Sequence, residues 1–310
     1  MRHLDETLRV RVIAASSAMW IAPALIGPAA TLGLEHLIGW RWTLLVPIPF
    51  VLGGRFLVAR TIGDKPPPTG PSRPIGRTML VPLGVAGIVA GTAYWPIAAA
   101  GTVVAIVGVT AIMPTGTARL VRGTPAALAA MTLFAVGYFG ADSLITVLLT
   151  SGYNTSLGRA AIVLGAAPLA WGLTSLTIAR FVNDTAKRRF PVIGLALSTL
   201  GVAAVALGPS TGGFFAIALI GWTLTGAGVG LAYPVLYLLA TTAGPHAQDA
   251  ASLATAVITA EAFGGLLGSA AGGAISSNAH TVGLTIAYLL FSASLAAAAY
   301  AATRSSTTTR

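Results

Sequence analysis

Runs of about twenty apolar residues recur along this chain of 310 residues, and few charged residues interrupt them. A helix of that length spans the hydrocarbon core of a bilayer, which is about 30 Å thick. Only 8% of the residues are charged, whereas a soluble domain carries about 25%. The runs also lack the short alternating pattern of outer-membrane barrels. We therefore expect an all-α, polytopic bundle of about ten transmembrane helices.

The positions of the apolar runs predict ten spans. The third and fourth are short and meet at Trp95-Pro96, which indicates a tight helical hairpin. The longest connection, Asp64 to Arg77, is rich in proline and glycine and indicates an irregular linker. The expected spans are residues 12–34, 42–62, 79–95, 97–117, 125–150, 158–181, 190–208, 213–243, 249–276 and 281–303.

Ten spans place both termini on one side of the membrane, and the basic residues gather on that side. Of the 18 lysines and arginines, all except Arg41 and Arg159 lie in or beside segments of that side. Cytoplasmic loops carry such an excess, so both termini are expected in the cytoplasm. Topology thus explains the net charge of +10 without nucleic acid. The alanine and glycine richness suggests a bacterial source, and hence the bacterial plasma membrane.

Several kinds of chemistry are absent from the sequence. The chain has no cysteine, and its four histidines show no metal-ligand spacing. Gly226, Gly228 and Gly230 follow no strand, which excludes a dinucleotide-binding loop, and no ATP-binding loop of the G-x-x-x-x-G-K-[ST] form occurs. We therefore expect no cofactor and no metal site. A membrane-embedded transferase or hydrolase is disfavoured because acidic residues at the interface are sparse and the loops are short.

The first span contains an unusual run, IAPALIGPAATLGLEHLIGWRW, from Ile21 to Trp42. An interior proline costs a soluble helix about 3 kcal/mol, but a membrane helix tolerates one where neighbours satisfy the freed carbonyl. Pro23, Gly27 and Pro28 therefore predict a kinked helix with a close helix contact at the glycine. An ordinary kink without further function would give the same pattern.

This run, followed by the turn GWRW and a span with Pro47 and Pro49, resembles spans five and six of major facilitator superfamily transporters, in particular the fourteen-span drug:proton antiporters. The antiporter motif of that family is G-x-x-x-G-P-x-x-G-G. Gly27 and Pro28 match its central pair. Pro23 stands at the position of its first glycine, and Thr31 and Leu32 stand at the positions of its closing pair.

Further segments resemble the family in the same order along the chain. The short hairpin from Met79 to Thr117 is similar to the two extra spans of the fourteen-span type. YFGADSLITVLLTSGYNTS, from Tyr138, is similar to the start of the second six-helix half, and GAGVGLAYPVL, from Gly226, to a glycine-rich segment of that half. ARFVNDTAKRRF, from Ala179, resembles the cytoplasmic signature of an acidic residue followed by basic ones, with Lys187 nearest to the position of its usual glycine.

The resemblance implies a partial major facilitator fold that lacks the first four spans. We expect a division into residues 1–62 (the last two helices of the first bundle), 63–78 (a cytoplasmic linker), 79–117 (an inserted hairpin), 118–303 (a six-helix bundle) and 304–310 (a cytoplasmic tail). A misassigned start, a truncated gene or a split transporter would each produce this arrangement. In a split transporter, a separate chain would supply the four missing helices.

Two carboxylates lie deep inside expected spans, at Asp142 and Glu261. A charge at the bilayer centre costs about 2.5–3.5 kcal/mol on insertion scales, so such residues tend to face a cavity and to have a function. We expect them to couple protons or to bind a cationic substrate; a buried carboxylate that bridges helices is the structural alternative. Tyr138, one helical turn before Asp142, and Tyr233 are candidates to line the same path, or else to pack in the core.

Two further groups of residues are candidates for a cytoplasmic gate and for a helix-packing face. Asn183, Asp184, Lys187, Arg188 and Arg189 are interpreted either as a cytoplasmic gate or as simple topological charge. Glycines at spacings of three and four predict a helix-packing face: Gly264, Gly265, Gly268, Gly272 and Gly273. Arg41 and Trp42 are expected to anchor the outer turn at the interface.

The function that follows is a secondary transporter, or part of one, that exports a small amphipathic or cationic molecule and is driven by protons. Two alternatives stay open at this point. One is a complete ten-span permease of the drug/metabolite type, although residues 1–151 show no self-similarity to the remainder. The other is an inactive transporter fragment.

Overall fold

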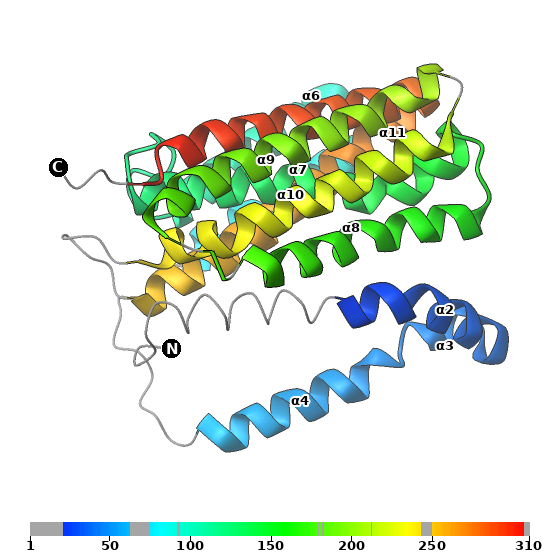
Figure 1. Cartoon of the computed structure of the whole chain (residues 1–310), viewed down its shortest axis with the longest axis horizontal. Coiled ribbons are helices and arrows are strands. Elements are labelled where there is room, and N and C mark those ends of the chain that lie inside the picture. Colours follow the sequence, from blue (N-terminus) through cyan, green and yellow to red (C-terminus); the bar gives the residue numbers. More distant parts are fainter. Residues whose placement is uncertain are drawn as a thin grey trace.

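The computed structural model of the chain is a bundle of α-helices (Figure 1). It describes residues 21–62, 75–91, 94–178, 180–181, 183–211, 213–242 and 250–306. These ranges contain no strand, which confirms the expected all-α class. The α-helices are α2 (Ile21–Ile38), α3 (Trp40–Thr43), α4 (Pro47–Ile62), α5 (Ile75–Ala90), α6 (Trp95–Ile112), α7 (Thr124–Val147), α8 (Leu157–Ile178), α9 (Asp184–Leu207), α10 (Phe215–Thr241) and α11 (Ala250–Thr303).

Within the described ranges, eight helical stretches are long and apolar enough to cross a membrane. The helix Met79–Ala90 is apolar but shorter, and the first expected span, 12–34, begins outside these ranges. Trp40–Arg60 and Trp95–Ile112 are two of the eight. The other six correspond to the last six expected spans: Thr124–Gly152, Leu157–Ile178, Thr185–Leu207, Phe215–Thr241, Ser252–Ser276 and Thr281–Thr303.

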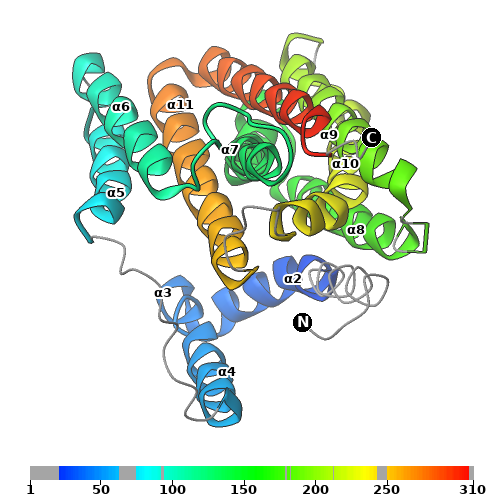
Figure 2. The same ribbon diagram turned by 90° about the vertical axis from the view of Figure 1, so that its left-hand side faces the viewer.

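The longest helix, α11, crosses the bundle twice. A Cβ atom at Gly272 would lie only 2.7 Å from Cζ of Phe291, 19 positions further along the same helix. In a straight helix these residues would be roughly 28 Å apart at 1.5 Å per residue. The stretches Ser252–Ser276 and Thr281–Thr303 therefore lie side by side, and Figure 2 shows the two directions of α11 around α7.

Helix α7 lies in the centre of the bundle, where it contacts α8, α10 and both crossings of α11 (Figure 2). Glycines allow the close approach. A Cβ at Gly264 would meet the Thr132 carbonyl oxygen at 2.6 Å, and one at Gly137 would meet the Phe291 carbonyl oxygen at 2.8 Å. A Cβ at Gly273, in contrast, would meet no atom within 4 Å. The expected packing face is thus confirmed at Gly264 but does not extend to Gly273.

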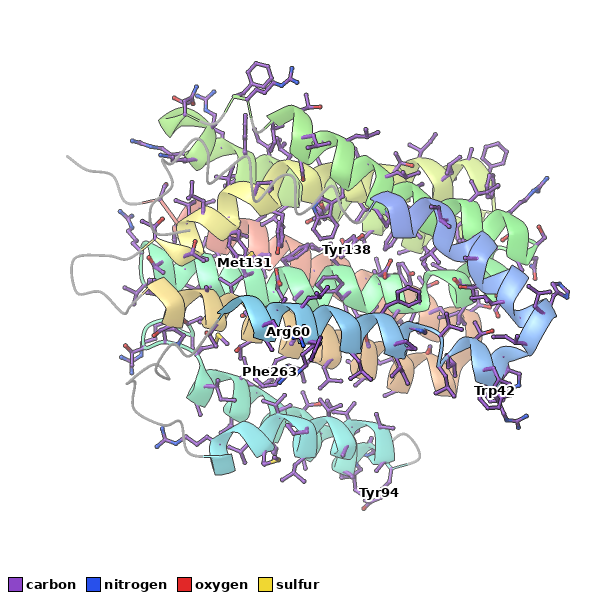
Figure 3. All side chains as sticks on the ribbon, turned by 90° about the horizontal axis from the view of Figure 1, so that it is seen from below. Trp42, Arg60, Tyr94, Met131, Tyr138 and Phe263 are labelled. Carbon is purple, nitrogen blue, oxygen red and sulfur yellow. The ribbon has the colours of Figure 1, made fainter. Side chains whose placement is uncertain are left out.

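Tertiary hydrogen bonds fix the two ends of the bundle. At one end, Thr124 Oγ1 donates to the Thr242 carbonyl oxygen at 2.7 Å, which joins the start of α7 to the end of α10. At the other end, the hydroxyl of Tyr153 donates to the carbonyl oxygen of Val205 at 2.8 Å. Trp42 and Tyr94 are exposed at this second end (Figure 3), as is typical of aromatic residues at a membrane interface.

The segment from α2 to α4 lies along one side of the bundle (Figures 1 and 2), where α2 contacts α8. The helix α2 runs through positions 23 and 28 and ends at Ile38, before Gly39, which has a φ of 79°. A Cβ at Gly27 would meet no described atom within 4 Å, so the close contact expected there is not formed among the described residues. Among the described elements, α2 contacts mainly α8 and α3.

Candidate functional site

Asp142 lies in the central helix α7, where it is partly buried and close to two tyrosines. Tyr138, one turn earlier, is almost fully buried. Tyr288, in the second crossing of α11, donates a hydrogen bond from its hydroxyl to the carbonyl oxygen of Ala141 at 2.6 Å. Both phenols lie within electrostatic range of the Asp142 carboxylate. Asp142 thus faces polar groups of the bundle interior.

Glu261 lies in the first crossing of α11 and is partly buried beside Tyr233 of α10. The hydroxyl of Tyr233 lies within electrostatic range of the Glu261 carboxylate. The Glu261 Oε1 atom is itself buried and has no hydrogen-bond partner among the described residues. A buried carboxylate oxygen without a donor costs free energy, so this site has an unused capacity to accept a hydrogen bond or to face a cation.

A chain of aromatic rings connects the two carboxylates. The ring centroids of Tyr138 and Trp171 are 5.5 Å apart in an edge-to-face arrangement, and those of Trp171 and Tyr233 are 5.2 Å apart. The order of contacts is therefore Asp142, Tyr138, Trp171, Tyr233 and Glu261. Aromatic rings present a negative face, on which cations bind.

Two more aromatic side chains complete this cluster. Trp222 of α10 stacks on Tyr138 with a centroid distance of 5.8 Å and an interplanar angle of 5°. Phe134 of α7 lies 5.7 Å from Tyr138 and 6.3 Å from Trp171, measured between centroids. We call Phe134, Tyr138, Trp171, Trp222 and Tyr233 the aromatic cluster. Figure 3 shows Tyr138 inside the bundle, away from its two ends.

The two carboxylates lie at different depths along α7. Gly264, which follows Glu261 by three residues, packs against Thr132, and both helices run in the same direction. Asp142 follows Thr132 by ten residues, which corresponds to roughly 15 Å along a helix. The structure therefore does not join Asp142 and Glu261 in one ion-binding pair. The two residues lie at separate positions, one on each side of the aromatic cluster.

Trp171 and Trp222 were not predicted as site residues. They are only 6% and 0% exposed, and the indole Nε1 atom of each has no acceptor among the described residues. A signal in the sequence could have identified them, because tryptophan in membrane proteins concentrates at the interfaces whereas these two lie well inside their spans. Together with Glu261 Oε1, they leave three buried polar atoms of the site without a described partner.

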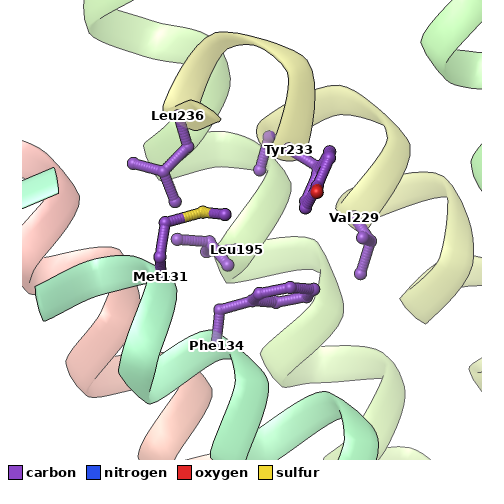
Figure 4. A pocket seen from close by; sticks show the side chains of 7 residues that line it. Met131, Phe134, Leu195, Val229, Tyr233 and Leu236 are labelled. Atoms are coloured by element: carbon purple, nitrogen blue, oxygen red, sulfur yellow. The ribbon is translucent and has the colours of Figure 1, made fainter. Parts of the chain in front are cut away.

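The aromatic cluster is closed in this structure. Figure 4 shows a small space below Tyr233, between α7, α9 and α10, lined by Met131, Phe134, Leu195 and Val229. This space has no room for a water molecule between the side chains. The structure thus corresponds to a state in which this side of the cluster is packed.

The residues expected to form a gate lie at the end of the bundle where α9 begins. Asn183 precedes α9, and its Oδ1 accepts a hydrogen bond from the Ala186 N–H at 2.8 Å, so it caps the helix. Arg188 and Arg189 are exposed, and Lys187 is half-buried. The side chains of Asp184, Pro23 and Pro28 lie outside the described part of the chain.

This arrangement presents groups that attract an organic cation. Carboxylates supply negative charge at two depths, the rings supply faces for a cation, and the indole N–H groups can donate to an acceptor. Among the described residues, no group of histidine and acidic side chains has the arrangement that holds a metal ion.

Comparison with known proteins identifies the family. A comparison with curated proteins gave no match. A family model described as Major Facilitator Superfamily matches residues 2–269, which include α2 to α10 and most of the first crossing of α11. The members of this family are membrane transporters rather than enzymes, and they move small molecules across a lipid bilayer. This match, together with the apolar helices, shows that the chain belongs to the Major Facilitator Superfamily.

Proposed function

We propose that the chain acts in proton-coupled export of a small amphipathic or cationic molecule. The observation that supports this most is the connection of Asp142 to Glu261 through Tyr138, Trp171 and Tyr233. A cationic substrate with an apolar body fits such a site because its charge is attracted by carboxylates and ring faces, while its body replaces ring-to-ring contacts.

Coupling follows when a proton and the substrate compete for the same carboxylate. A transporter exposes its central site to the two sides of the membrane in turn. If Asp142 holds a proton on the side from which protons enter and loses it before the substrate cation binds, inward proton movement drives outward substrate movement. Glu261, at the other depth, then serves to attract the cation from the end at which α9 begins.

Transport by purified protein in vesicles tests this proposal. Uptake of a cationic fluorescent dye is measured with and without an imposed pH gradient, for the wild type and for Asp142→Asn. We expect the wild type to move the dye faster with the gradient and the variant to lose that acceleration. Glu35→Gln is the matched control, because Glu35 is an exposed acidic residue near the end of α2, far from the aromatic cluster.

The outcomes distinguish the coupling residue from the substrate site. If Asp142→Asn transports with unchanged dependence on the gradient, Asp142 does not couple protons. If Glu261→Gln binds the dye as tightly as the wild type does in an equilibrium assay, Glu261 is not part of the substrate path. Absence of dye transport by the wild type under all gradients would contradict export of cations.

The fourteen-span antiporter type is the arrangement that we propose within the family. It is supported by the hairpin of α5 and α6, which stands between α4 and the six-helix bundle in the chain. The two helices pack closely on each other, since a Cβ at Gly101 would lie 2.6 Å from the Gly84 carbonyl oxygen. Exchange of residues 75–112 for a short linker tests whether the hairpin is an accessory element. If it is, the shortened protein should retain transport.

A further part of this proposal concerns α4. Every described side chain from Pro47 to Arg60 is exposed, and Arg55 stands in the middle of this apolar helix. We infer that additional transmembrane helices, in the same or in a separate chain, cover α4 and neutralise Arg55. Co-purification of such helices by the wild type, and its loss in Arg55→Leu, would support this; equal recovery with both would contradict it.

The proposed location is the bacterial plasma membrane, with the end of α11 in the cytoplasm. The end of the bundle where α7 and α9 begin carries most of the described basic residues, whereas Arg41 and Arg159 lie at the other end. The absence of cysteine permits a direct test. Ser156→Cys should react with a membrane-impermeant maleimide in intact cells, and Ser306→Cys should react only after lysis; the reverse pattern would contradict the orientation.

A further inference from the structure

A basic surface forms where the loop between α6 and α7 meets the end of α11. The N–H group of Gly123 donates a hydrogen bond to the carbonyl oxygen of Arg304 at 2.9 Å. This bond places Arg304 beside Arg122, although the two are far apart in the sequence. Arg119 belongs to the same loop, and all three arginines are exposed. We call Arg119, Arg122 and Arg304 the arginine surface.

The loop that carries two of these arginines has a defined conformation. Gly116 and Leu120 adopt positive φ values of 91° and 51°, which reverse the chain direction. The N–H of Val121 donates to the Gly116 carbonyl oxygen at 3.1 Å, and the N–H of Ala126 donates to the Val121 carbonyl oxygen at 3.0 Å. The backbone is therefore ordered before any ligand arrives, which lowers the entropic cost of binding.

The positive charge of this surface is not neutralised locally. Residues 113–123 and 301–306 contain no acidic residue. Helix α9, which contacts α11, begins with Asp184 followed by Lys187, Arg188 and Arg189, so this neighbouring element adds net positive charge. Three guanidinium groups without an anion favour a phosphate, to which arginine can donate two parallel hydrogen bonds.

Apolar and aromatic side chains border the arginines. The guanidinium of Arg304 lies 5.5 Å from the ring centroid of Tyr300, one turn earlier on α11, and Tyr300 is 56% exposed. Val121, next to Arg122, is 50% exposed. Since Thr281–Thr303 is a membrane-crossing stretch, the exposed Tyr300 ring lies where acyl chains meet head groups.

We propose that the arginine surface binds the phosphate head group of an anionic phospholipid, with the lipid tail along Tyr300. The charges account for the head group, and the lipid-facing ring accounts for a ligand that is anchored in the bilayer instead of a soluble phosphate. The bound lipid would hold the α6–α7 loop against the end of α11 and so stabilise the start of the central helix α7.

Competitive lipid binding tests this proposal independently of transport. The full-length protein is placed in nanodiscs of phosphatidylcholine with a minor fraction of phosphatidylglycerol, and co-purified lipid is quantified after detergent exchange. We expect the wild type to enrich phosphatidylglycerol. Each arginine near an anionic head group strengthens binding by roughly fivefold, so Arg122→Gln and Arg304→Gln should each reduce the enrichment by about that factor. Arg159→Gln, at the other end of the bundle, is the matched control and should retain it.

A second measurement separates the lipid from a free anion and from a folding defect. Phosphatidylglycerol should raise the midpoint of thermal unfolding of the wild type and of Arg159→Gln, but not that of Arg122→Gln. An equal increase with glycerol phosphate in solution would overturn the assignment to a lipid. Equal enrichment by the wild type and by both single variants would overturn the site itself. If Arg122→Gln does not fold, Arg304→Gln and the conservative Arg304→Lys decide the outcome, with partial retention expected for lysine.

Discussion

The hydroxyl of Tyr288 donates a hydrogen bond to the carbonyl oxygen of Ala141 at 2.6 Å and so joins the second crossing of α11 to the residue before Asp142. The bond is fully buried and connects positions 147 residues apart. It fixes the rotation of α7 relative to α11, and this rotation determines the direction in which Asp142 points. The acceptor of this structural hydrogen bond, Ala141, is therefore the immediate neighbour of the candidate coupling residue Asp142 on α7.

Removal of this hydroxyl should weaken the bundle. Tyr288→Phe keeps the ring that packs against Phe291 and loses one buried hydrogen bond, which is worth about 1 kcal/mol. We expect a lower midpoint of thermal unfolding in detergent. Tyr300→Phe alters an exposed tyrosine of the same helix and should leave the midpoint unchanged. Equal stability of Tyr288→Phe and the wild type would show that the bond is not formed in the membrane-extracted protein.

Titration of Tyr153 should make the stability of the fold depend on pH in the alkaline range. It follows the span that ends at Gly152, and burial raises the pKa of its phenol from 10.0 to about 12. Between these values the unfolded chain loses the phenol proton while the folded chain retains it, so stability present below pH 10 declines as the pH rises towards 12. Denaturant unfolding between pH 9 and pH 12 should show a shallower decline for Tyr153→Phe than for the wild type, roughly over this interval.

The same variant also removes the hydrogen bond to Val205, so its stability at neutral pH should be lower by about 1 kcal/mol. The two effects have different signatures, since one is independent of pH and the other is not. Identical slopes for Tyr153→Phe and the wild type above pH 10 would contradict the assignment of this titration to Tyr153.

Close packing of α7 on α11 can be tested with two glycines of the same helix. A Cβ at Gly268 would overlap the Val136 carbonyl oxygen, whereas a Cβ at Gly273 would meet nothing within 4 Å. Gly268→Val should therefore destabilise the fold by about 1–3 kcal/mol or prevent folding. Gly273→Val should have little effect. Yield and elution of the folded protein in size-exclusion chromatography provide the measurement, and equal behaviour of the two variants would show that α7 and α11 are less closely packed.

Asn183 offers a way to separate helix capping from gating. Asn183→Ala removes the hydrogen bond to the Ala186 N–H and should cost about 1 kcal/mol, while Asn183→Ser retains a capping oxygen and should be nearly neutral. If Asn183 acts only as a cap, Asn183→Ser should transport as the wild type does. A stable Asn183→Ser protein that no longer transports would instead show that the amide has a role in gating.

The sequence predicted where the spans lie, because hydropathy is a local property of the chain. The expected spans 249–276 and 281–303 correspond to Ser252–Ser276 and Thr281–Thr303. It also located Asp142 and Glu261 inside their spans, since a charge in an apolar run is visible without a structure. The functional roles of both residues stay predictions.

The parts that were missed depend on helix rotation and on neighbours distant in sequence. Trp171 contacts Tyr138 and Tyr233 because of the way α7, α8 and α10 are rotated about their own axes. Hydropathy does not reveal this rotation, because these helices are apolar on all sides. The contact expected at Gly27, which no described residue makes, illustrates a related point. A glycine permits close approach, but it does not specify which helix, if any, comes to occupy that face.

The double crossing of α11 around α7 has a mechanical consequence. Gly137 contacts one crossing and Gly264 the other, each without space for a methyl group. Sliding of α7 against either crossing would force atoms to overlap at these glycines, so the packing favours movement of the three helical stretches as one unit. If transport exposes Asp142 to the two sides of the membrane in turn, as we propose, that change of exposure would come from a tilt of these stretches together and not from sliding between them.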